Sequence, residues 1–160
     1  MFGHSMGAVI AFEAARGLVR RGITPAGLLA SGSPAPGRPR RRGPVGDDEL
    51  IADLGLLAGT GRELLEDEAM LRIVLPVLRA DYALLDSHRP APGVALPCPI
   101  TALTGDRDPR VTPEEAEEWR THTSADFHLG VFPGGHFFLD EHAPDIRALI
   151  LDRLGAPAAS

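Results

Sequence analysis

Residues 1–8 read Met-Phe-Gly-His-Ser-Met-Gly-Ala, and this stretch decides how the rest of the chain is interpreted. Residues 3–7 form the pattern Gly-x-Ser-x-Gly, in which a serine occupies a strained turn between a strand and a helix, so that the flanking positions must be small. Two apolar residues precede the pattern and a helix-forming sequence follows it. The pattern therefore predicts a strand end before Ser5 and a helix after it.

The rest of the chain alternates between short apolar runs and helical patterns. Three further strands are predicted from the apolar runs, at residues 26–31, 99–104 and 127–132. Helices are predicted over residues 6–21, over 47–88, from Pro113 after an N-cap at Thr112, and over about 141–154. Pro76 lies inside the second helical stretch, where we expect a kink or a break. The alternation favours an α/β fold with a parallel sheet and right-handed crossovers.

Candidate partners for the serine follow two later strands of this sheet. A serine hydroxyl needs a base, and the base needs an orienting group. His136 follows the last predicted strand and is the candidate base, because functional groups gather at the carboxyl ends of parallel strands. Asp106 and Asp108 both follow the preceding strand, and either one satisfies the chain order Ser, Asp, His. Asp108 is favoured because Pro109 biases it toward an extended conformation.

The other five histidines are weaker candidates for the base. His4 lies inside the serine motif and is expected to point away from Ser5, and His128 lies on the polar face of a strand. His142 is near a helix start, and His88 and His122 are expected on the surface of helical stretches.

Several segments together resemble type II thioesterases, the stand-alone editing enzymes of nonribosomal peptide and polyketide synthesis. They are residues 2–8 (FGHSMGA), 75–82 (LPVLRADY), 99–109 (PITALTGDRDP), Trp119 and residues 132–139 (FPGGHFFL). The resemblance implies one α/β-hydrolase domain over residues 1–160, with a helical lid inserted at about residues 45–90. Ser5 would be the nucleophile, His136 the base and Asp108 the group that holds the imidazole.

The same resemblance implies a substrate and a partner. The substrate would be an acyl or aminoacyl thioester on the phosphopantetheine arm of an acyl or peptidyl carrier protein, and no metal or cofactor is implied. The basic residues 38–42 are one possible contact for an acidic carrier protein, although a solvated loop explains them as well. Two alternatives stay open: another esterase of the same fold, and a non-catalytic remnant.

Members of that family have a substantial N-terminal part ahead of the serine motif. We therefore expect this chain to represent the C-terminal portion of such an enzyme, whether as a fragment, a misplaced start codon or a decayed gene product. The amide of Met6, at a helix N-terminus, is the expected oxyanion donor. The second donor comes from a loop in the N-terminal part and is not expected here.

Composition excludes other classes of protein. The formal net charge is -6, which argues against nucleic-acid binding. No apolar run approaches the roughly 20 residues needed to span a bilayer, and no signal peptide is visible, so we expect a cytoplasmic protein. The single cysteine, Cys98, excludes an internal disulfide, fits a reducing compartment and is expected to be a small buried filler.

Overall fold

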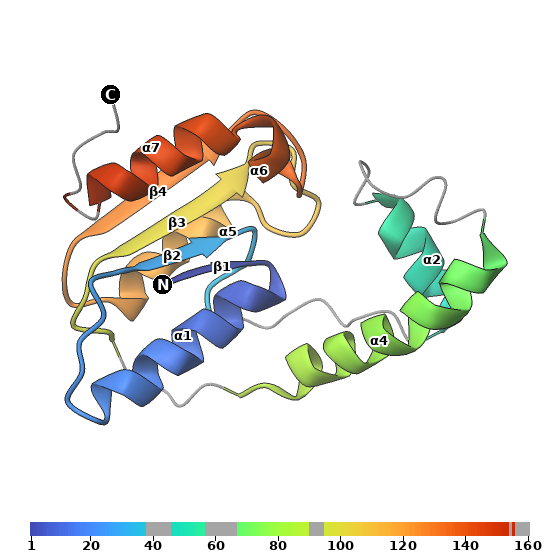
Figure 1. Cartoon of the computed structure of the whole chain (residues 1–160), viewed down its shortest axis with the longest axis horizontal. Coiled ribbons are helices and arrows are strands. Elements are labelled where there is room, and N and C mark those ends of the chain that lie inside the picture. The colour runs from blue at the N-terminus through green and yellow to red at the C-terminus, as the bar shows by residue number, and fades with distance from the viewer. Residues whose placement is uncertain (38–45, 57–66, 90–94, 154, 156–160) are drawn as a thin grey trace. The chain divides into compact units, whose positions relative to one another are not determined.

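A computed structural model describes residues 1–37, 46–56, 67–89, 95–153 and 155 of the chain (Figure 1). The chain divides into two compact units. The first, Met1–Pro36 with Pro92–Ser160, is called the sheet unit below, and the second, Gly37–Ala91, is called the two-helix unit. The basic residues 38–42 lie outside the described residues.

The sheet unit contains a four-stranded parallel sheet with the strand order β1-β2-β3-β4. The strands are β1 (Phe2–His4), β2 (Leu28–Ser31), β3 (Ile100–Gly105) and β4 (Phe127–Phe132). Each predicted strand is present, with ends that differ only slightly from the prediction. The predicted α/β fold with a parallel sheet is confirmed.

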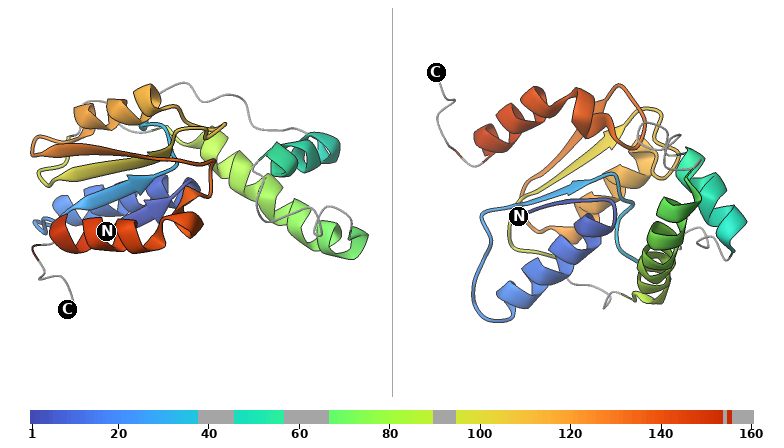
Figure 2. Two further views of the ribbon diagram at one scale, coloured as in Figure 1. Left: turned by 90° about the horizontal axis from the view of Figure 1, so that it is seen from above. Right: turned by 45° about the vertical axis from the view of Figure 1, so that its right-hand side comes forward.

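Helices lie on both faces of this sheet (Figure 2). They are α1 (Met6–Val19), α5 (Pro113–Glu117), the 3-10 helix η1 (Glu118–His122), α6 (Phe138–Glu141) and α7 (Ala143–Arg153). One core cluster joins α1, α5 and η1 to the sheet, and it includes Phe12, Leu28, Ile100, Ala116 and Trp119. A second cluster joins α6 and α7 to β3 through Phe138, Ile146 and Leu103. The two clusters bury the strands between helices, as the continuous apolar runs indicate.

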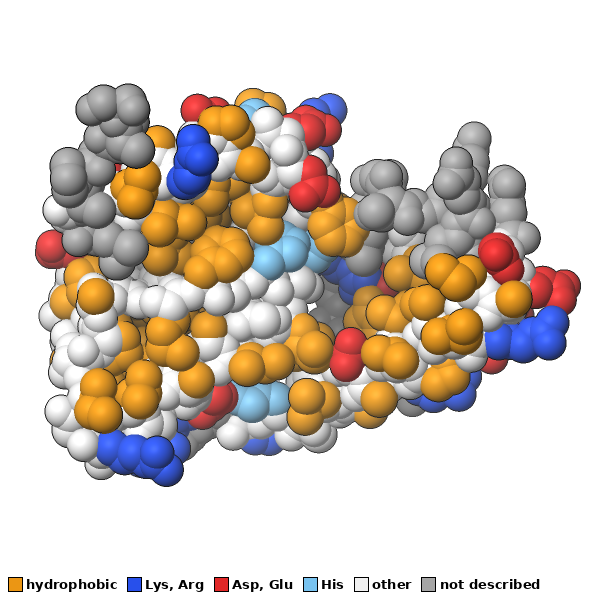
Figure 3. Space-filling view, viewed as in Figure 1, with side chains coloured by type: hydrophobic (Ala, Val, Ile, Leu, Met, Phe, Trp, Pro, Cys, Tyr) orange, Lys and Arg blue, Asp and Glu red, His pale blue; other side chains and the backbone are white. Residues whose placement is uncertain are grey.

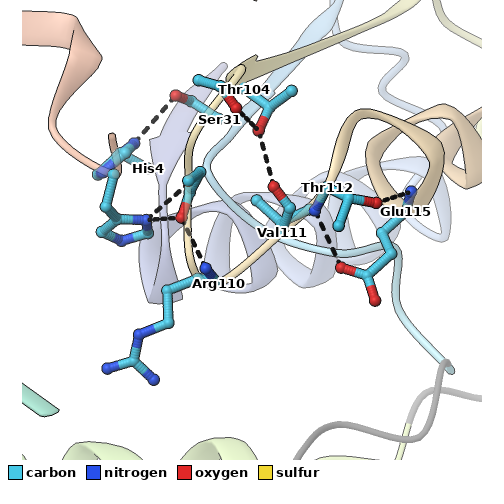
Figure 4. Close-up of polar contacts among 10 residues, drawn as sticks. His4, Ser31, Thr104, Arg110, Val111, Thr112 and Glu115 are labelled. Carbon is cyan, nitrogen blue, oxygen red and sulfur yellow. Dashed lines mark hydrogen bonds and ion pairs between the residues drawn. The ribbon is translucent and has the colours of Figure 1, made fainter. Parts of the chain in front are cut away.

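The start of α5 shows how local sequence fixes an element. The Thr112 hydroxyl accepts the Glu115 N–H at 3.3 Å, and the Glu115 carboxylate accepts the Thr112 N–H at 3.0 Å (Figure 4). This capping box satisfies two amides that the first helical turn leaves free, and Pro113 opens the helix without losing a needed donor. The predicted N-cap is confirmed.

The two-helix unit consists, in its described part, of α2 (Asp47–Leu56) and α4 (Glu68–Ser87). Residues 57–66 of the predicted helical stretch lie outside the described residues. The Tyr82 hydroxyl donates to the Asp53 carboxylate, and this bond joins the two helices. None of the helices that the structure describes is both long and apolar enough to cross a lipid bilayer.

A kink or a break was expected at Pro76, and α4 continues through this residue without a break. Proline removes one helical hydrogen bond and costs about 3 kcal/mol or more inside a helix. Leu75, the residue before Pro76, is buried. Tyr82, about two helical turns after Leu75, donates a hydrogen bond to Asp53 of α2. Packing of this face against α2 offsets the cost of the missing hydrogen bond.

Candidate active site

Ser5 occupies a strained turn between β1 and α1. Its backbone angles are φ 55° and ψ −119°, and it is the one described residue other than glycine with a positive φ. Its N–H donates to the carbonyl of Ser31 at 2.7 Å, which ties the turn to the end of β2. Such strain persists only where the surrounding structure enforces it, and it often marks a functional position.

Gly3 explains why the turn can close. A Cβ added at Gly3 would lie 2.0 Å from the carbonyl oxygen of Gly7, which is backbone and cannot move aside. A Cβ added at Gly7 would meet no atom of the described residues within 4 Å. The expectation that both positions flanking Ser5 must be small therefore holds at Gly3. At Gly7 the side-chain position is open, and it is the backbone carbonyl of Gly7 that approaches Gly3 closely.

His136 and Asp108 form a buried pair at the ends of β4 and β3. Nδ1 of His136 lies 2.9 Å from Oδ2 and 3.1 Å from Oδ1 of Asp108, and the two residues are 4% and 7% exposed. The N–H of Arg110 donates to Oδ1 of Asp108 at 2.8 Å and fixes the carboxylate. A carboxylate at Nδ1 selects the tautomer that carries its proton there, which leaves Nε2 free to act as a base.

Asp106 holds the loop that carries His136. Its Oδ1 accepts the N–H of Gly134 at 2.8 Å, and the N–H of Arg107 donates to the carbonyl of Gly134 at 2.9 Å. The hydrogen bond from Gly134 is the main cause that lowers the pKa of the Asp106 carboxyl. Of the two candidate acids, Asp108 therefore contacts His136, and Asp106 binds loop amides.

The structure places Ser5, Asp108 and His136 at the carboxyl ends of β1, β3 and β4, which is one edge of the parallel sheet. Within the described part of the chain, no hydrogen bond joins the Ser5 hydroxyl to His136. Such bonds are often long in free enzymes and tighten when substrate binds. The amide of Met6 lies in the first turn of α1, where helical geometry leaves amides without a partner inside the helix. The three-residue assignment and the Met6 donor stay predictions.

His4 is a feature of the site that sequence reasoning did not pair with His136. The two imidazole rings lie 4.8 Å apart between centroids, and Nδ1 of His4 shares a 2.9 Å hydrogen bond with the hydroxyl of Ser31 (Figure 4). Burial, and after it the nearby His136, lower the pKa of His4 to about 4, against the opposite effect of the carboxylates of Asp108 and Asp140. His4 is therefore neutral at pH 7.

His122 corrects another expectation, since it is not a plain surface residue. Its ring lies 5.4 Å from that of Phe12 and 5.8 Å from that of Trp119, and burial lowers its pKa. Trp119 is fully buried, and its indole N–H donates to the carbonyl of Ser33 at 2.8 Å. These contacts support the core under α1 and leave His122 away from the His136 pair.

The described residues include no cluster of three or more His, Cys, Asp or Glu side chains that could hold a metal ion. Cys98 is buried, as expected for a small filler, and burial raises the pKa of its thiol. A thiol of this kind is protonated at neutral pH and is a poor nucleophile.

A model of the thioesterase domain family matches residues 1–154. The chain belongs to the thioesterase family. It is 44% identical, over 99% of its length, to a probable cadicidin biosynthesis thioesterase of Streptomyces griseus, and 43% identical, again over 99%, to Thioesterase PikA5 of Streptomyces venezuelae. It covers 45% and 59% of these two proteins, so it spans about half the length of the curated relatives that it matches.

Solved structures of thioesterases also superpose on this chain. The type II thioesterase BorB from the borrelidin biosynthetic cluster superposes with a TM-score of 0.84 at 47% identity, over 96% of this chain and 64% of that one. The RedJ thioesterase from the prodiginine pathway of Streptomyces coelicolor superposes with a TM-score of 0.83 at 37% identity, over 95% and 61%. The resemblance to type II thioesterases and the predicted α/β-hydrolase class are confirmed.

Proposed function

We propose that this thioesterase hydrolyses acyl or aminoacyl thioesters from the phosphopantetheine arms of carrier proteins in antibiotic biosynthesis. The observation that carries the proposal is the buried His136–Asp108 pair at the same sheet edge as the strained Ser5 turn. The proteins named for cadicidin, borrelidin and prodiginine biosynthesis, which this chain resembles, support this substrate class. The buried free Cys98 fits the cytoplasmic location that we propose.

The proposed reaction has two halves. Nε2 of His136 takes the proton of the Ser5 hydroxyl while Oγ attacks the thioester carbonyl, and the resulting oxyanion accepts the N–H of Met6. The C–S bond then breaks, and His136 returns the proton to the departing thiolate. Water attacks the acyl-Ser5 ester with His136 again as base, which releases the acid and restores the serine. Asp108 orients the imidazole and stabilises its charged form throughout.

We assign the helical lid to about residues 45–90, which fall within the two-helix unit. The described part of α4 exposes the apolar side chains Met70, Ile73, Val77 and Leu84. A surface of this kind is suited to contact an acyl chain or a partner protein. The lid would therefore govern which acyl groups are accepted, while Ser5, His136 and Asp108 perform the chemistry.

Labelling with a fluorophosphonate tests the nucleophile. The chain should be labelled at Ser5, and Ser5→Ala should abolish labelling, whereas Ser87→Ala at the exposed end of α4 should label like the wild type. Labelling of Ser5→Ala at the wild-type rate would contradict the assignment. A folded wild-type chain that neither labels nor hydrolyses any ester would favour the non-catalytic remnant.

Hydrolysis assays separate the two enzymatic alternatives. Acyl thioesters on a phosphopantetheinylated carrier protein should be cleaved with a higher kcat/KM than oxygen esters of the same acyl group. The matched control is Ser5→Ala on both substrates, which measures the background hydrolysis to be subtracted. A preference for the oxygen esters would favour a general esterase of the same fold.

A further inference from the structure

A second imidazole lies beside His136, and the proposed reaction does not use it. The ring of His4 lies 4.8 Å from that of His136 between centroids, with 45° between the ring planes. It is also 6.1 Å from the ring of Phe137 and 6.2 Å from that of Phe138. His4 therefore lies beside both the candidate base and the aromatic residues that follow the base in sequence.

His4 is held by Ser31 at the end of β2. Its backbone pairs with Ser31 in the parallel register of β1 and β2, and its Nδ1 shares a hydrogen bond with the buried hydroxyl of the same residue. Nε2 of His4 is buried and has no hydrogen-bond partner among the described residues. A buried polar atom without a partner costs free energy, so a histidine with no function at this position would be unfavourable.

Gly32 makes room for both imidazoles. It has a φ of 57°, and a Cβ added there would lie 2.6 Å from Cε1 of His4 and 3.2 Å from Cε1 of His136. The two rings therefore contact the same glycine immediately after β2. A side chain at this position would displace one ring or both.

We propose that His4 is a positioning residue whose neutral ring, held by Ser31 beside Gly32, fixes the plane of the His136 imidazole. The proposal rests on the role of His136 as the base. Asp108 contacts only Nδ1 of His136, so the ring can still tilt about that contact. A tilt moves Nε2 relative to Ser5, and a misplacement of about 1 Å can lower a rate about 100-fold. His4, whose ring lies 4.8 Å away between centroids, limits how far the His136 ring can tilt toward it.

The neutral state of His4 matters for the same reason. His136 becomes positively charged when it takes the serine proton. A charged His4 at a centroid separation of 4.8 Å would oppose that step, because like charges destabilise one another. Burial keeps His4 uncharged, so the ring restrains its neighbour without repelling the proton.

Two substitutions at His4 separate the ring from its polar groups. His4→Ala removes the ring and should lower the saturating rate of fluorophosphonate labelling at Ser5 by about 10- to 100-fold, with little change in half-saturation. His4→Phe keeps a flat ring and should stay within a few-fold of the wild type. His128→Ala, which removes a histidine from β4 outside the site, is the control and should label normally.

Proton NMR gives a readout that does not depend on activity. The Nδ1 proton of His136, bonded to Asp108, should give a downfield signal that is sharp in the wild type and in His4→Phe. In His4→Ala the signal should broaden through exchange with water. If His4→Ala fails to fold, His4→Leu, which fills the space without a flat ring, should produce the same broadening more weakly.

The outcomes distinguish the two proposals. A wild-type chain that is not labelled would contradict the proposed function, and the placement of His136 by His4 would still be supported if the Nδ1 signal were sharp in the wild type and broad in His4→Ala. A folded His4→Ala variant that labels at the wild-type rate with an unchanged Nδ1 signal would overturn the positioning role. Equal losses in His4→Ala and His4→Phe would also overturn it, because the ring would then not be the restraining element.

Discussion

The sheet unit and the two-helix unit differ in how they use their apolar side chains. In the sheet unit, Phe12, Ile100 and Trp119 are at most 1% exposed. In the described part of the two-helix unit, the buried apolar side chains are Leu50 and Leu75. On α4, Met70, Ile73, Val77 and Leu84 are between 45% and 67% exposed, and hydrophobic side chains run along this unit on the face drawn in Figure 3.

The difference fits the two roles proposed above, with the chemistry in the sheet unit and the choice of acyl group in the two-helix unit. Close packing holds neighbouring atoms in fixed positions, which the proposed chemistry of Ser5 and His136 requires. Exposed apolar side chains add little to stability and are typical of a surface that contacts something else. Substitutions in the sheet unit should therefore affect folding and the geometry of the site, whereas those on the exposed face of α4 should affect which acyl groups are used.

The largest effect is expected at Gly3. Gly3→Ala forces a Cβ to within 2.0 Å of the Gly7 carbonyl oxygen, so the turn at Ser5 cannot close. We expect a loss of more than about 4 kcal/mol in the free energy of unfolding, measured with denaturant, or no soluble protein. Gly7→Ala is the matched control, and it should change stability by no more than about 1 kcal/mol. Similar unfolding curves for the two variants would show that the turn tolerates a side chain.

A second large effect is expected at Trp119. Trp119→Ala removes a fully buried ring from the cluster that joins η1 to α1 and should cost about 3–5 kcal/mol. Trp119→Phe keeps most of the packing but leaves the carbonyl of Ser33 without its indole donor, which should cost about 1–3 kcal/mol. Thermal or denaturant unfolding measures both. Equal losses would mean that the missing hydrogen bond accounts for the loss and that packing of the ring adds little.

Sequence reasoning succeeded where the cause was local. The apolar run of β4 and the capping box between Thr112 and Glu115 each depend on a few consecutive residues, and both appear as predicted. The preference for Asp108 over Asp106 also rested on a local cause, the neighbouring Pro109. The contact of Asp108 with His136 agrees with that preference.

Sequence reasoning failed where a residue's surroundings depend on contacts with residues far away in the sequence. His122 was expected at the surface because its own helix gives no sign of the rings of Phe12 and Trp119. The pairing of His4 with His136 depends on strand order and on the bare Gly32 between them, neither of which a local pattern reveals. Pro76 was expected to kink or break its helix, and the contact between α4 and α2 that accompanies the unbroken helix is not visible from the local pattern.

A moderate, pH-dependent effect is expected from His4. Burial and the nearby His136 lower its pKa in the folded chain to about 4 from the ordinary 6.5. Between these two pH values, the unfolded chain therefore binds a proton at His4 that the folded chain does not. The stability from this residue is fully present above about pH 6.5 and is lost as the pH falls toward about 4. The thermal unfolding midpoint should therefore fall over this window. In His4→Phe the fall should be smaller, and an equal fall in both proteins would remove His4 as its cause.

The smallest effect on stability is expected on the exposed face of α4. Ile73 is 67% exposed, so Ile73→Ser should change the free energy of unfolding by less than about 0.5 kcal/mol. Leu75→Ala, two residues further along on the buried face, is the matched control and should cost about 2–5 kcal/mol. If α4 is part of the lid, Ile73→Ser should still change the ratio of kcat/KM between long and short acyl thioesters, while fluorophosphonate labelling of Ser5 stays at the wild-type rate. An unchanged ratio would separate this face of α4 from substrate selection, and the contrast between the two units would then be one of packing alone.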